Sequence, residues 1–237
     1  ELHYQPQIHH SGRVAGVEAL IRWYHPERGN IPPGQFIPLA EDTGQIIPIS
    51  EWVMETACRD AVVLNAESAT PITMAINVSP MQFQRPGFLD SVKQVLARSG
   101  LPPALLELEL TEGVLMDSAE HTIQALQALR QLGVHIALDD FGTGYSSLSY
   151  LRLFPLNTLK IDRSFISDIE SNDNSIALVK AIITMAHNLD VMVVAEGVET
   201  QAQADFLKQL GCDEVQGFMY AKPMPEVELI QYIESKK

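Results

Sequence analysis

Val134-His135-Ile136-Ala137-Leu138-Asp139-Asp140-Phe141-Gly142-Thr143-Gly144 combines an apolar run, a pair of aspartates and a glycine-containing segment. The apolar run predicts a buried strand. Two adjacent carboxylates at the end of such a strand resist ionising together, because like charges repel. A pair of divalent cations that share one carboxylate would neutralise them, and hard cations of this kind prefer oxygen ligands. If other strands also end in acidic residues, the stretch predicts a metal-dependent hydrolase built on a parallel barrel.

The length and composition of the chain agree with one barrel domain. A single α/β barrel commonly has about this length, 237 residues, and the 46% hydrophobic residues are enough for a large core. No stretch approaches the roughly 18 consecutive apolar residues of a membrane helix. A strand-like pattern begins at Glu1 to Tyr4 without a signal peptide. We therefore expect residues 1–237 to be a single domain excised from a longer protein.

The charge of the chain excludes one class of function. The formal net charge is −14, from 30 acidic and 16 basic side chains. This balance argues against binding of a DNA or RNA polymer through a basic face. Most of the acidic side chains are expected to be solvated at the surface. The two cysteines, Cys58 and Cys212, form no CxxC pair, which favours a reducing compartment over a disulfide framework.

Strand patterns alternate with helical patterns along most of the chain. A hairpin is predicted first, from Leu2–Ile8 and Val14–Trp23. Further strands are predicted at Ile72–Val78, Leu105–Leu110, Val134–Asp139, Thr158–Asp162, Met192–Glu196 and Glu214–Gly217. Helices are predicted at Ile49–Ala66, Gln124–Leu132, Asn174–Asn188 and Ala202–Leu210. About eight strands of this kind predict a closed parallel barrel. The alternative, an open doubly wound sheet, would need a glycine-rich phosphate turn after an early strand, and the sequence contains none.

Oxygen-bearing side chains collect where the predicted strands end, which is where a barrel of this kind places its active site. A single residue of this type is usually solvated or caps a helix, but chance would not place them at the same end of so many successive strands. Histidine and cysteine are absent from the set, so Mg²⁺ or Mn²⁺ is favoured over zinc. The set, with one lysine, comprises Glu18, Asn77, Glu109, Glu112, Asp139, Asp140, Lys160, Asp162, Glu196, Glu199 and Gln216.

The alternation of side chains along a strand distinguishes the two aspartates. Asp139 shares a face with Ala137 and should point into the barrel mouth, whereas Asp140 should reach the same place from the rim. This arrangement suits one bridging carboxylate and one terminal ligand. The following segment, Gly142 to Ser147, lacks the Gly-Lys pair of a phosphate-binding loop and is interpreted as a loop tied to the metal site.

Lys160 is the one cation among these carboxylates. It could form a structural ion pair with Asp162 or another neighbour. It could instead hold a water molecule or stabilise the charge that develops on a phosphate. Its position at a strand end favours the second role.

Seven segments follow one another in order along essentially the whole chain: Glu18-Ala19-Leu20-Ile21-Arg22-Trp23, Asn77-Val78-Ser79-Pro80, Glu109-Leu110-Thr111-Glu112, Asp139 to Ser147, Lys160-Ile161-Asp162-Arg163-Ser164-Phe165, Glu196-Gly197-Val198-Glu199-Thr200 and Gln216-Gly217-Phe218. Together they resemble the motifs of the EAL domains, the bacterial phosphodiesterases of cyclic di-GMP. The resemblance implies a TIM-like (β/α)8 barrel whose first strand runs antiparallel to the others. It also implies hydrolysis of one phosphodiester bond of cyclic di-GMP to linear 5'-pGpG, with two divalent cations, Mg²⁺ or Mn²⁺.

The resemblance assigns roles to individual residues. The implied metal ligands are Glu18, Asn77, Glu109, Asp139, Asp140 and Glu196. Lys160 would orient the attacking water, and Glu196 and Asp140 complete the implied catalytic set. The implied substrate contacts are Gln5, Leu20, Arg22, Asp162 and Gln216. Glu112 and Glu199 would support the loop that follows Asp140.

The resemblance also implies partners and leaves alternatives. A homodimer is expected, with sensor or GGDEF domains in the parent chain. The domain would be cytoplasmic in a bacterium, and its parent protein can be membrane-anchored. The main alternative is a catalytically silent receptor that binds cyclic di-GMP without cleaving it. A protein-interaction domain that binds no ligand is a further alternative.

Overall fold

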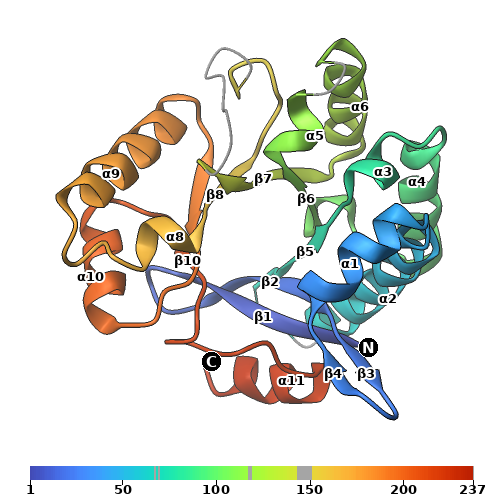
Figure 1. Ribbon diagram of the computed structural model, residues 1–237, viewed down its shortest axis with the longest axis horizontal. Coiled ribbons are helices and arrows are strands. Elements are labelled where there is room, and N and C mark those ends of the chain that lie inside the picture. The colour runs from blue at the N-terminus through green and yellow to red at the C-terminus, as the bar shows by residue number, and fades with distance from the viewer. Residues whose placement is uncertain (67, 69, 117–118, 143–150, 237) are drawn as a thin grey trace.

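Eight strands close into a barrel, as the sequence predicts (Figure 1). The computed structural model describes residues 1–66, 68, 70–116, 119–142 and 151–236. Around the barrel the strands follow the order β1-β10-β9-β8-β7-β6-β5-β2. Their bounds are β1 Leu2–His9, β2 Val14–Ile21, β5 Thr73–Asn77, β6 Leu106–Thr111, β7 His135–Phe141, β8 Thr158–Ile161, β9 Met192–Ala195 and β10 Glu214–Val215.

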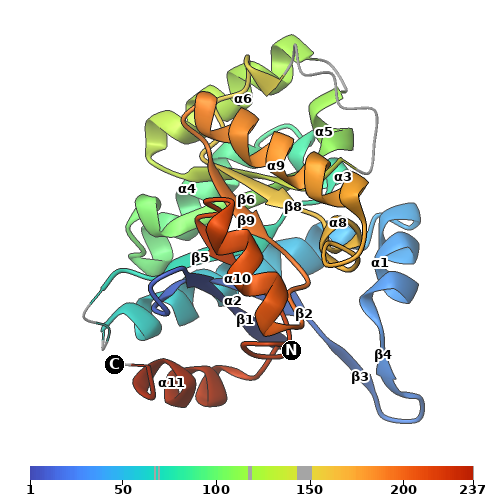
Figure 2. The same cartoon turned by 90° about the vertical axis from the view of Figure 1, so that its left-hand side faces the viewer.

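The first strand runs against the rest, which confirms the implied variant of the barrel. β1 pairs antiparallel with β2 and with β10, and every other pair in the barrel is parallel. The carboxyl ends of β2 and β5 to β10 therefore meet at one end of the barrel, called the mouth below. The short strands β3 (Trp23–His25) and β4 (Gly29–Ile31) form a separate hairpin that projects from the barrel (Figure 2).

Helices form the outer layer of the barrel (Figure 1). Their bounds are α1 Pro33–Asp42, α2 Ile46–Ala66, α3 Pro80–Phe83, α4 Phe88–Ser99, α5 Glu112–Met116, α6 Ala119–Leu132, α8 Arg163–Ile166, α9 Asp173–Asn188, α10 Gln201–Gln209 and α11 Glu226–Glu234, with a 3-10 turn at Pro103–Leu105. The four predicted helices correspond to α2, α6, α9 and α10. The longer helices α1, α4 and α11 and the short helices α3, α5 and α8 were not predicted from the sequence. Within the described ranges, no helix has the length and apolarity required to cross a bilayer.

The core lies between the barrel and the helices, and β6 shows how the sequence produces it. Leu106, Leu108 and Leu110 alternate with Glu107 and Glu109, so the leucines face outward and the glutamates face into the barrel. The leucines belong to the main apolar core cluster, which also contains buried side chains of α6. Both glutamates are buried as well. Strand β6 is therefore buried on both faces, although every second residue from Leu106 to Leu110 is a glutamate.

The structure ends β8 one residue earlier than predicted. Asp162 lies beyond the strand and caps α8, where its carboxylate accepts a hydrogen bond from the Ser164 N–H at 3.0 Å. Asp162 caps the helix instead of extending the strand because the first N–H groups of a helix have no partner within the helix.

Candidate active site

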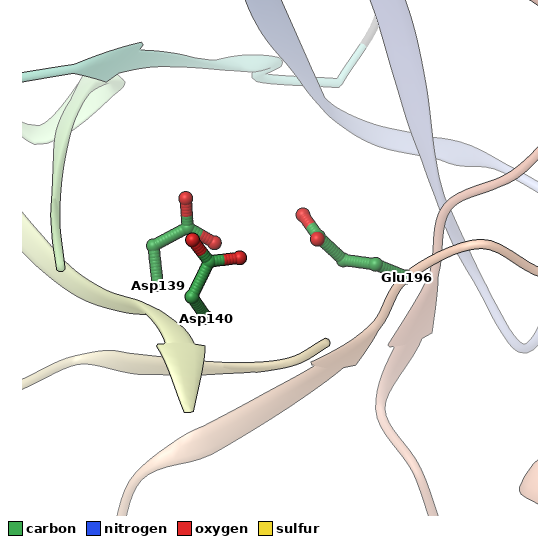
Figure 3. Close-up of side chains that lie close together, drawn as sticks. All are labelled: Asp139, Asp140 and Glu196. Carbon is green, nitrogen blue, oxygen red and sulfur yellow. The ribbon is translucent and has the colours of Figure 1, made fainter. Parts of the chain in front are cut away.

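Side chains from successive strands converge at the mouth of the barrel. The structure brings together the predicted residues Glu18 of β2, Asn77 of β5, Glu109 of β6, Asp139 and Asp140 of β7, Lys160 of β8, and Glu196 and Gln216, which directly follow β9 and β10. In three of them, Asp139, Asp140 and Glu196, one carboxylate oxygen each lies within 4.8 Å of the others. Glu196 points toward the two aspartates from the opposite side (Figure 3).

A β-bulge explains how two adjacent aspartates reach one site. The pairing of β7 with β8 shifts register between Leu138 and Phe141, so β7 contains one extra residue there. Asp140 occupies this position with a φ of 54°, in the left-handed region. Aspartate adopts this conformation more readily than most residues, and a bulge re-aims the side chains beside it. Adjacent side chains of a regular strand would point to opposite faces, but here both carboxylates reach the mouth.

Lys160 occupies the centre of the group. Its side chain is fully buried, and its Nζ lies 2.7 Å from Glu109 Oε1 and 2.7 Å from Glu196 Oε1. Asp139 Oδ1 and Glu18 Oε2 lie farther away, at 3.4 Å and 3.5 Å. The ion pair that was the alternative role for Lys160 is thus present, and its partners are these four carboxylates.

Glu18 is held by amide groups on the other side. Asn77 Nδ2 donates to its Oε1 at 2.7 Å, and Gln216 Nε2 donates to its Oε2 at 2.6 Å. The Gln216 Nε2 also donates to Gln5 Oε1 at 3.1 Å, and Gln5 Nε2 donates to the carbonyl of Ala221. Burial opposes the ionisation of Glu18, but Lys160 and these hydrogen bonds outweigh it and lower its pKa. Glu18 is therefore ionised at neutral pH.

The remaining carboxylates are harder to ionise. Burial, followed by the charge of Glu18, raises the pKa of Glu109 well above its ordinary value. Burial and then Asp139 raise the pKa of Asp140. Burial raises the pKa of Glu196 to about 7, although Lys160 acts against it. Burial alone would lower the pKa of Lys160, but the surrounding carboxylates raise it well above its ordinary value. Lys160 therefore keeps its proton and is a donor in any reaction at this site.

The chemistry of the group fits divalent cations. Five carboxylates and one ammonium, at −5 + 1, have a formal charge of −4, which equals the charge of two divalent cations with opposite sign. Glu109 Oε2 is buried and has no hydrogen-bond partner among the described residues, whereas Oε1 contacts the Lys160 ammonium. An uncompensated buried carboxylate is costly, so the site favours added positive charge. Oxygen donors of this kind are the ligands that Mg²⁺ and Mn²⁺ prefer.

An apolar cavity of about 290 Å³ lies beside the mouth. The predicted contacts Leu20 and Arg22 line it, together with Asn77. Pro33 and Ile37 of α1 also line the cavity, and this helix was not predicted from the sequence. The signal was present, since a proline at the first helical position precedes two buried residues four apart, Phe36 and Ala40.

The two residues predicted to support the loop after β7 lie in different settings. Glu112, at the start of α5, accepts a hydrogen bond from the Gly142 N–H at 2.8 Å. The rest of the predicted loop, residues 143–147, lies outside the described residues. Glu199 is exposed near the N-terminus of α10, and its backbone N–H donates to Gln203 Oε1 at 2.8 Å.

Comparisons with known proteins agree with this geometry. The chain is 46% identical over 230 residues to the bifunctional diguanylate cyclase/cyclic di-GMP phosphodiesterase MucR of Pseudomonas aeruginosa, covering 97% of this chain and 34% of that protein. It is 42% identical over 226 residues to the cyclic di-GMP phosphodiesterase PdeR of Escherichia coli, covering 95% of this chain and 34% of that protein. The chain thus spans about a third of the length of these relatives.

A solved structure extends the likeness to three dimensions. The PaMucR phosphodiesterase in complex with c-di-GMP superposes with a TM-score of 0.93 at 47% identity, over 97% of this chain and 93% of that chain. A family model described as EAL domain matches residues 1–223. The chain therefore belongs to the EAL domain family.

Proposed function

We propose that this chain hydrolyses one phosphodiester bond of cyclic di-GMP to give linear 5'-pGpG. The observation that carries the proposal is the convergence of five carboxylates and Lys160 at the barrel mouth. The likeness to phosphodiesterases of cyclic di-GMP supports the choice of substrate.

Two divalent cations, Mg²⁺ or Mn²⁺, are proposed to bind in this group. Glu18, Asn77, Glu109 and Asp139 would hold one, and Asp140 and Glu196 would hold the second together with Asp139. When bound, the cations would lower the pKa of a water molecule and neutralise charge on the phosphate. They would also offset the repulsion between an anionic substrate and a protein of net charge −14.

Lys160 is proposed to orient the attacking water and to stabilise negative charge on the phosphate. Its raised pKa keeps it protonated, so it can donate hydrogen bonds but cannot act as a base. Glu196 has a pKa near neutrality, which is the range of a general base. It also belongs to the group that would hold a cation, and a carboxylate engaged in this way is a poor base. We therefore rank Glu196 as a ligand first.

Substrate contacts are proposed along the rim of the mouth. Leu20 and Arg22 line the adjacent cavity, which supports the proposal that they contact one nucleotide. Asp162 lies close enough to Asp140 to raise its pKa, so it borders the same space. Gln216 is proposed to contact the water or phosphate, and Gln5 reaches the site through its hydrogen bond with Gln216. Asp140 and the supports Glu112 and Glu199 are proposed to tie the following loop to the site.

The test is a cleavage assay with cyclic di-GMP and either Mg²⁺ or Mn²⁺, at several protein concentrations. Chromatography should show pGpG, no turnover in EDTA, and recovery when the metal is restored. Unchanged turnover in a chelator would contradict the metal requirement. Tight binding without pGpG would indicate the receptor alternative. A rate per molecule that rises with protein concentration would support the proposed homodimer.

The setting of the domain is also a proposal. The relatives named above are about three times longer than this chain. We propose that the parent protein carries further domains, such as a sensor or a GGDEF domain, and that this domain acts in the bacterial cytoplasm.

A further inference from the structure

The segment after β9, which carries Glu196, is fixed by hydrogen bonds on two sides. On one side, the Glu196 N–H donates to the Ile161 carbonyl of β8 at 3.0 Å. On the other side, the Val198 N–H donates to the Gln216 carbonyl and the Met219 N–H donates to the Val198 carbonyl, both at 3.1 Å. The segment therefore lies between β8 with its following helix and the turn after β10.

Gly217 allows the turn after β10 to pack directly on this segment. A Cβ atom at position 217 would lie 2.0 Å from the Val198 carbonyl oxygen and 2.3 Å from the Val198 nitrogen. The φ of Gly217 lies outside the left-handed region, so the residue is required for space and not for its backbone conformation. The atoms that such a Cβ would meet are backbone atoms, which cannot rotate away.

Gly197 allows similarly close packing on the side of the segment that faces α8. It directly follows Glu196 and has a φ of +70°. A Cβ atom here would lie 2.3 Å from the Cβ of Arg163 and 3.2 Å from its Cα, at the first residue of α8. The absence of a side chain thus lets α8 and the segment approach closely.

We infer that Gly197 and Gly217 are positioning residues for the metal-ligand group. This inference rests on the proposed function, because it takes Glu196 to be a metal ligand. To restore an ordinary contact of 3.4 Å, an alanine at position 217 would have to displace the Val198 carbonyl by 3.4 − 2.0 = 1.4 Å. Metal–ligand distances tolerate about 0.2 Å. A shift of this size two residues from Glu196 would therefore move the Glu196 carboxylate out of the range of metal–ligand distances.

The first experiment compares Gly217→Ala with Gly34→Ala. Gly34, in α1, also lies outside the left-handed region, and a Cβ atom at position 34 would have no neighbour within 4 Å among the described residues, so it is a control for the loss of a glycine without a steric clash. Mn²⁺ affinity is measured by calorimetry with the metal alone, and the melting temperature is measured without metal. Gly217→Ala should weaken Mn²⁺ binding by about 10-fold or more, the range seen when groups that orient ligands are lost. Gly34→Ala should bind Mn²⁺ like the parent chain.

The second experiment compares Gly197→Ala with Gly211→Ala. Both glycines have a left-handed backbone, but a Cβ atom at position 211 would meet none of the described residues within 4 Å. Both variants should therefore show a drop in melting temperature from backbone strain, and the clash with Arg163 should add to the drop in Gly197→Ala. Only Gly197→Ala should lose Mn²⁺ affinity. Adding Arg163→Gly removes the nearest clashing atom and should restore much of that affinity, although the backbone strain at position 197 remains.

The outcomes separate this inference from the proposed function. Equal Mn²⁺ affinity in Gly217→Ala and Gly34→Ala, or no rescue by Arg163→Gly, would overturn the positioning role. If Gly217→Ala does not fold, the comparison of Gly197→Ala with and without Arg163→Gly tests the positioning role. Normal Mn²⁺ binding by the parent chain without cleavage of cyclic di-GMP would overturn the proposed function and leave the positioning role intact.

Discussion

The two ends of the barrel interior use the same strands and the same kind of side chain in different ways. β6 contributes Glu107 and Glu109, and β8 contributes Thr158 and Lys160. The members of each pair lie two residues apart, so both face the interior, one level below the other. Glu107, Thr158 and Glu214 form the lower level, called the floor here. Glu109 and Lys160 belong to the mouth.

The floor disfavours the ionised form of its carboxyl groups. Glu107 accepts a hydrogen bond from the Thr158 hydroxyl at 2.6 Å, but burial still raises its pKa. Burial, with a contribution from Glu107, raises the pKa of Glu214 to about 7. At the mouth, by contrast, four carboxylates surround the Lys160 ammonium. A buried glutamate alone is thus no sign of function; several carboxylates that converge on a cation are.

The largest expected effect is at the centre of the mouth. Lys160→Ala should reduce turnover of cyclic di-GMP by about 10²–10³-fold, because a donor that stabilises developing charge is lost. Binding of cyclic di-GMP should remain largely intact in a calorimetric titration. Lys93→Ala is the matched control, since Lys93 forms an exposed ion pair with Asp90. Parallel losses of binding and turnover would contradict a role in the chemical step.

Glu109→Gln should separate metal binding from stability. Loss of this ligand should weaken Mg²⁺ affinity by about 100-fold. This is the upper end of the loss seen when a residue that only orients a metal ligand is removed. The melting temperature without metal should rise, because burial and Glu18 already disfavour the charge of Glu109. Calorimetry and thermal unfolding measure the two effects. A fall in both quantities would mean that Glu109 is mainly a structural partner of Lys160.

The floor should make stability depend on pH through Glu214. Its pKa in the folded chain is about 7, above the ordinary value of 4.5, so the folded state binds more protons between these values. The contribution of Glu214 to the free energy of unfolding should therefore be largest below pH 4.5. This contribution should fall by roughly 1–3 kcal/mol as pH rises through about 7. Denaturant unfolding across this range measures the slope. Glu214→Gln should flatten it, and an unchanged slope would assign it to other groups.

The smallest effect is expected for Glu107→Gln, two residues from Glu109 on the same strand. Glutamine resembles a protonated glutamate and can still accept the Thr158 hydrogen bond, so stability should change by no more than about 1 kcal/mol. Mg²⁺ affinity, measured beside that of Glu109→Gln, should match the parent chain. A loss comparable to that of Glu109→Gln would show that the floor belongs to the metal site.

Much of the fold could be predicted because its signals are local. The leucine–glutamate alternation of β6 and the helical spacing that ends at Gly133, whose φ is 96°, identify elements with only a few neighbouring residues. The projecting β3–β4 hairpin and α1 were missed. Short strands and a helix of modest length carry weak periodicity, so packing against the rest of the chain decides them.

The sequence by itself determined the types of residue at the strand ends, the order of the strands along the chain and, through its motifs, the family. Only the tertiary structure decided how those residues meet. The bulge at Asp140 turns a second carboxylate into the mouth, the capping of α8 engages Asp162, and Lys160 contacts four carboxylates from four different segments. The physical reason is that register, bulges and buried ion contacts depend on residues far apart in the chain, whose positions are set only when the barrel closes.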